Sequence, residues 1–121
     1  MSATAILDEM RDALRGELGQ GFSLISGFVN EQGRLLADQA VFIAEQRANG
    51  DLRDNDALYH FFLDGLKTNT ENMARSVAML TALTIEKAWN AIANALWGGL
   101  RGILTAAGVP APLIPGAPPH V

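Results

Sequence analysis

Residues 49–56 read Asn-Gly-Asp-Leu-Arg-Asp-Asn-Asp, and this polar stretch decides how the chain folds. Gly50 suits the left-handed position that ends many helices, and Asp54 or Asn55 can cap the helix that follows. All five prolines, which would interrupt a helix, lie at or beyond residue 110. The sequence therefore predicts an all-α protein built on a long antiparallel helical hairpin, with its turn near residues 49–55.

Upstream of the turn, apolar side chains recur every seven residues on two neighbouring lines. In helical projection the lines are about 100° apart, which makes a broad apolar face of the kind that a helix buries in a bundle. The first line holds Leu7, Leu14, Gly21, Phe28, Leu35 and Phe42, and the second holds Phe22, Val29, Leu36 and Ile43. Between them run Gln32, Gln39 and Gln46, which either lie exposed at a seam or form hydrogen bonds across a helix interface.

Two further features of the helical part concern its continuity. Three glycines within residues 16–21 predict a kink or break, and hence a short separate N-terminal helix. Downstream of the turn, spacings of three and four predict one helix over residues 57–97 with a coiled-coil-like seam. That seam consists of Tyr59, Phe62, Leu66, Asn69, Met73, Ser76, Leu80 and Leu83.

After Leu83 the apolar line shifts, which indicates a different neighbour. The new line consists of Ile85, Trp89, Ile92, Leu96, Leu100 and Ile103. Residues 85–107 approach the ~20 residues that cross a bilayer, but Asn90, Asn94 and Arg101 make them a poor spanning helix. Burial in an oligomer, an interfacial or membrane position and a disordered end are the three interpretations.

The proline-rich residues 108–121 form a tail beyond the helical domain of residues 1–107. Proline cannot continue a helix, so an extended path is predicted. Leu113 and Ile114 give the tail apolar contacts for a neighbouring subunit, and a frayed end is the alternative.

The sequence offers no constellation for catalysis or for binding a metal or cofactor. Cysteine is absent and only two histidines occur, so thiolate chemistry and clustered metal ligands are not expected. No hydroxyl lies beside a histidine at a useful spacing. The net charge is −4, and no basic patch with interleaved aromatics predicts direct nucleic-acid binding. Met1–Gly16 carries acids and lacks the apolar core of a signal peptide, so we expect cytoplasmic synthesis.

The leading hypothesis is a non-enzymatic assembly protein that forms a homo-oligomer or binds other structural proteins. In general build, a small Ala-rich hairpin with a proline-rich arm resembles accessory virion proteins of tailed bacteriophages and, more loosely, amphipathic granule-coating proteins. The alternatives are a membrane- or lipid-surface protein anchored through residues 85–107, and a small adaptor subunit. The predicted interaction residues are Phe28, Leu35, Phe42, Tyr59, Phe62, Leu66, Met73, Leu80, Leu83, Trp89, Ile92, Leu96, Leu100, Ile103, Leu113 and Ile114.

Overall fold

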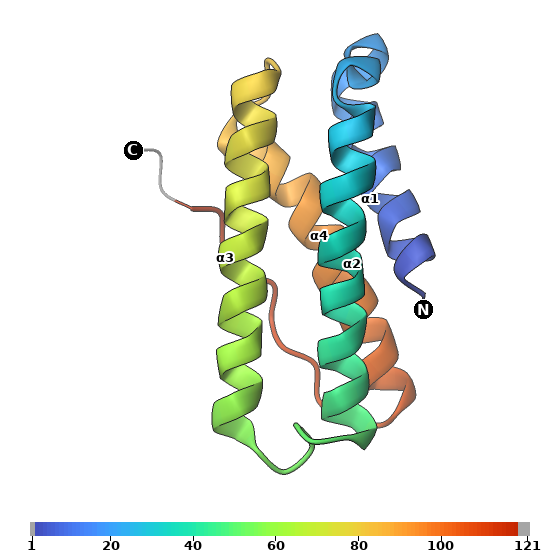
Figure 1. Cartoon of the computed structure of the whole chain (residues 1–121), viewed down its shortest axis with the longest axis vertical. Helices are drawn as coiled ribbons and strands as arrows, with labels where there is room; N and C mark the ends of the chain where they lie inside the picture. Colours follow the sequence, from blue (N-terminus) through green and yellow to red (C-terminus); the bar gives the residue numbers. More distant parts are fainter. Residues whose placement is uncertain (1, 119–121) are drawn as a thin grey trace.

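The computed structural model describes residues 2–118, and every regular element in that range is helical (Figure 1). The prediction of an all-α protein is therefore confirmed. In chain order the elements are α1 (Ala3–Leu18), the 3₁₀ helix η1 (Gly19–Leu24), α2 (Ser26–Asn49), α3 (Asp56–Leu80) and α4 (Ile85–Ala106).

The glycine-rich break is where the sequence predicts it. α1 ends at Leu18, and Gly19 adopts a positive φ of 57°, a conformation that costs glycine little. Residues 19–24 then form η1 before α2 begins, so α1 is the short separate N-terminal helix.

Residues 50–55 join α2 to α3, and the two helices lie side by side in opposite directions (Figure 1). Asn55 caps α3 by accepting a hydrogen bond from the Leu58 amide at 3.0 Å. The left-handed conformation predicted for Gly50 is wrong, because its φ is −126°. Glycine is needed there for space, since a side chain would collide with Gln46, whose Oε1 accepts a hydrogen bond from the Asp51 amide.

The prediction of one helix over residues 57–97 is also wrong, because α3 ends at Leu80 and α4 begins at Ile85. Thr81 marks the break: its hydroxyl donates to the Val77 carbonyl at 2.7 Å and accepts from the Leu83 amide at 3.1 Å. Thr84 then caps α4 by accepting from the Lys87 amide at 3.1 Å. Threonine hydroxyls thus supply the local hydrogen bonds that compete with a continuous helix.

The break lets α4 turn back and become the central helix. It packs against α1, α2 and α3, whereas no Cα atom of α1 comes within 8 Å of α3. In Figure 1, α4 lies behind the pair α2 and α3. Its large apolar side chains form the middle of the core, namely Trp89, Ile92, Leu96, Trp97, Leu100 and Leu104. The chain therefore folds into an arrangement of four α-helices with its own core.

The tail lies on its own chain. Residues 109–118 have no regular secondary structure, as expected for their prolines. The indole Nε1 of Trp89 donates to the Pro115 carbonyl at 3.0 Å, and Val109 and Ala111 pack against the core. The described tail therefore returns along α4 of its own chain; residues 119–121 of the predicted tail lie outside the described range.

Candidate functional site

Large apolar side chains at the surface are concentrated on two helices. Among residues 2–118, nine such residues are exposed, and six of them belong to α2 or α3. The six are Leu35, Phe42, Leu58, Phe61, Met79 and Leu80. Helix α4 packs behind these helices, so we call the outward surface of the pair, which faces the viewer in Figure 1, the α2–α3 face.

The helical register of α2 explains why part of its apolar face is left outside. The line through Val29, Leu36 and Ile43 is buried. The neighbouring line is turned about 100° away, and there Leu35 is 61% and Phe42 is 51% exposed. The core therefore covers only part of the apolar face of α2.

A groove of about 350 Å³ runs between α2 and α3 on this face. Its walls carry Leu35 and Gln39 from α2 and Asn69 and Asn72 from α3. The Asn69 amide donates to Gln39 Oε1 at 3.0 Å. For Gln39, this supports the interpretation of a hydrogen bond across a helix interface, and the bond fixes the relative height of α2 and α3.

An aromatic group closes the end of the face that lies toward residues 50–55. The ring centroids of Phe42 and Phe62 are 6.2 Å apart, and those of Phe62 and Phe61 are 5.9 Å apart, both in edge-to-face geometry. Phe61 is 70% exposed. The next turn carries Gly65, where an added Cβ would come no closer than 3.9 Å to another atom, so the surface beside the rings is open.

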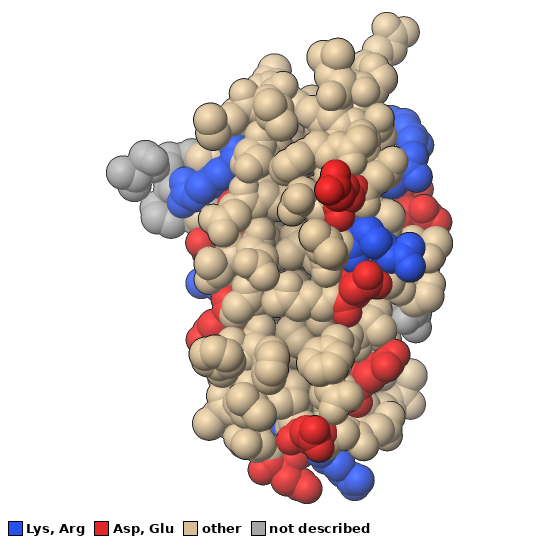
Figure 2. Space-filling view, viewed as in Figure 1, with Lys and Arg blue, Asp and Glu red and all other residues tan. Residues whose placement is uncertain are grey.

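Charged side chains flank the α2–α3 face and leave its middle uncharged, as Figure 2 shows. Those of α2 are Glu31, Arg34, Asp38 and Glu45, and those of α3 are Asp64, Lys67, Glu71 and Arg75. Arg34 and Asp38 form an ion pair at 3.3 Å, but both are largely exposed, so the pair contributes little to stability. The middle of the face is thus uncharged and combines exposed apolar side chains with the amides that line the groove. Depletion of charged residues at the centre is characteristic of protein–protein interfaces.

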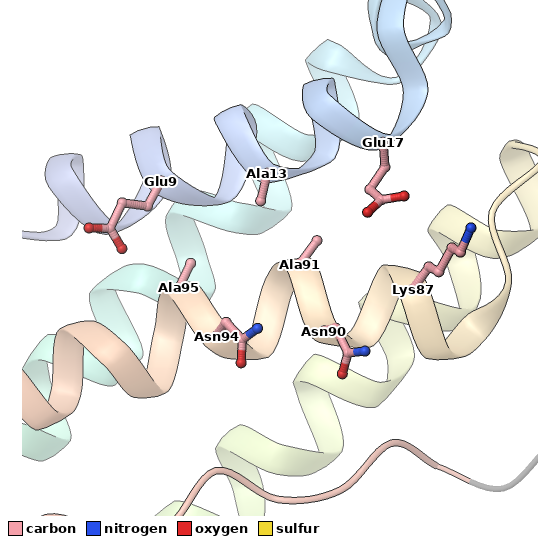
Figure 3. A pocket seen from close by; sticks show the side chains of 8 residues that line it. All are labelled: Glu9, Ala13, Glu17, Lys87, Asn90, Ala91, Asn94 and Ala95. Carbon is pink, nitrogen blue, oxygen red and sulfur yellow. The ribbon is translucent and has the colours of Figure 1, made fainter.

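A second groove, of about 410 Å³, lies between α1 and α4 (Figure 3). Ala13, Ala91 and Ala95 point into the space between the helices, whereas Asn90 and Asn94 point away from α1. Its titratable residues are Glu9, Glu17 and Lys87, and all three are exposed. Small alanines thus let the helices approach closely, and the polar side chains lie at the rim in solvent.

The structure separates the predicted interaction residues into three groups. Seven are buried in the chain's own core, which corrects the prediction that they face a partner: Tyr59, Leu66, Met73, Trp89, Ile92, Leu96 and Leu100. Four are partly buried against that core: Phe28, Phe62, Leu83 and Ile103. Five are exposed: Leu35, Phe42, Leu80, Leu113 and Ile114. Only Leu35, Phe42 and Leu80 of the exposed group lie on the α2–α3 face.

Three further exposed apolar residues of α3 were not among the predicted interaction residues, namely Leu58, Phe61 and Met79. Leu58 and Phe61 are three residues apart, which is the spacing of neighbours on a helix surface. That signal was present, but the longer seam through Tyr59 and Phe62 obscured it.

Two further observations bear on the function classes. Within residues 2–118, no group of three His, Cys, Asp or Glu side chains is placed to hold a metal ion. None of the helices described is both long enough and apolar enough to cross a membrane. Comparison of the chain with protein-family models, with curated proteins and with solved structures gave no match in any of the three.

Proposed function

We propose that this chain is a non-enzymatic assembly protein that associates through its α2–α3 face. The supporting observation is that six of the nine large apolar side chains exposed in the described part of the chain lie on these two helices. Exposed large apolar side chains concentrated on one surface, with charges at its rim, are typical of interaction sites. The groove and the open surface beside Gly65 make this face uneven, so that a surface of complementary shape can pack against it.

The apolar residues of α4 no longer support the alternative of a lipid anchor over residues 85–107. Trp89, Leu96 and Leu100 are already covered by the rest of the chain. An adaptor role stays open as a variant of the same proposal, in which the α2–α3 face binds a different protein. A bacteriophage particle as the setting stays a prediction, supported only by the general build described above.

The test is the association state of the full chain, measured by sedimentation velocity over a concentration series. We expect reversible self-association. Leu35→Asp and Phe61→Asp should each abolish it, because a charge in the middle of the interface would be desolvated without a partner. The far-ultraviolet circular dichroism of both variants should stay that of the wild type, since both side chains are exposed.

Leu113→Asp is the matched control, because Leu113 is 85% exposed but belongs to the tail. This variant should associate as the wild type does. A wild-type chain that stays monomeric at every concentration would contradict self-association. Equal association of all three variants would show that the α2–α3 face is not the contact.

A further inference from the structure

We infer that the partner of the α2–α3 face is a second copy of this chain, related by a two-fold axis parallel to α2 and α3. In this arrangement α2 of each copy lies against α3 of the other. The inference rests on the proposed function and deepens it, because it specifies the partner and its orientation. The heights of the charged residues on the two helices support a second copy, and the positions of Phe42 and Gly65 support this orientation.

Two contacts fix which residues of α2 and α3 are level with each other. Gln39 is hydrogen-bonded to Asn69, and the ring of Phe42 contacts that of Phe62. Because the helices are antiparallel, a step backward on α2 corresponds to an equal step forward on α3. Glu31 is therefore level with a position between residues 73 and 77, which contains Arg75.

The other flanking charges follow from the same two contacts. Arg34 is level with residues 70–74, which contain Glu71. Asp38 is level with residues 66–70, which contain Lys67. Glu31, Arg34 and Asp38 on the α2 edge are thus each level with an opposite charge on the α3 edge.

In Figure 2, charged side chains lie over α2 and along the outer side of α3, with an uncharged surface between them, and no charged residue lines the groove. A two-fold axis parallel to the helices keeps every height and exchanges the two edges. It therefore brings Glu31, Arg34 and Asp38 of one copy to Arg75, Glu71 and Lys67 of the other. Three complementary pairs form twice, which favours a second copy over an unrelated partner.

The apolar residues fit the same orientation. By the same heights, Phe28 is level with Met79, and Phe42 is level with Gly65. Phe42 of one copy can therefore occupy the open surface beside Gly65 of the other, since Gly65 has no side chain. The exposed aromatic ring and the missing side chain complement each other only when α2 lies on α3.

A two-fold axis across the helices is the competing arrangement. It would set α3 against α3 and α2 against α2, and bring Arg75 to Asp64, Lys67 to Glu71 and Arg34 to Asp38 of the second copy. Glu31 and Glu45 would then face apolar stretches of the opposing α2, because no basic residue lies level with either. The parallel axis leaves Glu45 and Asp64 without an opposite charge, so the two arrangements form equally many charge pairs. The fit of Phe42 beside Gly65 therefore distinguishes them, because only the parallel axis sets α2 on α3.

The test reverses one charge on each edge, with Glu31→Arg and Arg75→Glu in full-length chains at low ionic strength, where screening is weakest. Each single variant places two like-charge contacts in its homodimer and should raise the dimer dissociation constant roughly tenfold. Asp8→Arg, an exposed reversal on α1, is the control and should leave the constant unchanged.

The decisive measurement is a mixture of the two single variants, analysed by native mass spectrometry, which separates both homodimers from the heterodimer by mass. In the heterodimer both contacts are again between opposite charges, so its share should exceed the statistical half. A statistical mixture, or single reversals without effect in a wild-type chain that does self-associate, would overturn the orientation and leave the proposed function intact. Preferential pairing of Asp64→Arg with Arg75→Glu would show that the axis runs across the helices. A monomeric wild type would overturn the orientation and the proposed self-association together.

Discussion

Helix α4 and the α2–α3 face carry similar apolar patterns, but the apolar line of α4 is buried and that of the α2–α3 face is exposed. The line through Trp89, Leu96 and Leu100 is buried by three neighbouring helices and by the tail. The line through Leu35 and Phe42 has no helix over it and reaches the surface. A periodic apolar line thus indicates that a surface will be covered, but the line itself does not say whether the same chain or another one covers it.

Composition around the line distinguishes the two regions. Between residues 88 and 100, α4 carries no charged side chain, and its buried positions lie on nearly all sides. A helix that is apolar all round is normally buried. On α2, charged residues lie directly beside the apolar line, as Glu31 and Arg34 do beside Leu35. Such a line can reach the core only in part, because the charges beside it must stay in water.

The strongest test of this difference is one charge placed in each region. Leu96→Asp should lower the free energy of unfolding by roughly 3 kcal/mol or more, because Leu96 is fully buried and the carboxylate would have no partner. Leu80→Asp should change it by no more than about 0.5 kcal/mol, since Leu80 is 56% exposed. Urea unfolding, followed by circular dichroism on dilute protein, measures both. Equal losses would show that Leu80 belongs to the core, as the seam through Leu66 and Leu80 predicted.

Helix α4 is covered by the other helices and by the tail. Removing the tail should have a smaller effect on stability than a charge in the core. Deletion of residues 108–121 removes the Pro115 carbonyl from Trp89 Nε1 and should cost about 1 kcal/mol for the hydrogen bond. In a Trp97→Phe background, the emission of Trp89 should shift to the red as water reaches the indole. Association should persist, because the tail returns along α4 and not over the α2–α3 face. Loss of association without a red shift would instead place the tail on a neighbour.

Much of the fold could be predicted from residues whose effect is local. The glycines of residues 16–21 and the polar residues 49–56 break the helices where the sequence analysis placed the breaks. The break at Thr81 was missed, because it depends on hydroxyl groups that a helix also tolerates, with no glycine or proline to mark it. That one omission changed the predicted architecture, since α4 becomes the central helix only when the chain turns back.

The candidate site could be predicted only in part, for the same reason. Leu35, Phe42 and Leu80 were identified from spacing, and all three are exposed on the α2–α3 face. Trp89 and Leu96 had equally regular spacing and lie in the core. Spacing places residues on one side of a helix, but the path of α4 decides which sides remain free, and that path depends on contacts between residues far apart in the sequence.

The smallest predicted effect concerns the titration of Tyr59, which is buried near the start of α3. Its ring lies 4.3 Å from the Arg47 guanidinium, which also pairs with Asp56 at 2.8 Å. Its hydroxyl is buried with no hydrogen-bond partner among the described residues. Burial raises the pKa of Tyr59 above its usual 10.0, and the positive charge of Arg47 opposes this rise only in part.

The unfolded chain therefore releases the phenolic proton near pH 10.0, while the folded chain still holds it. The folded state then binds more protons, so the free energy of unfolding should be unaffected below that pH and should fall as the pH rises above it. Urea midpoints measured from neutral pH to about pH 11 should show this decline, and Tyr59→Phe should reduce it. Because the chain has a single tyrosine, its ultraviolet absorbance reports the same titration directly. A tyrosinate signal that appears near pH 10.0 in the folded protein would show that water reaches the Tyr59 hydroxyl. That result would contradict the burial of this hydroxyl in the structure.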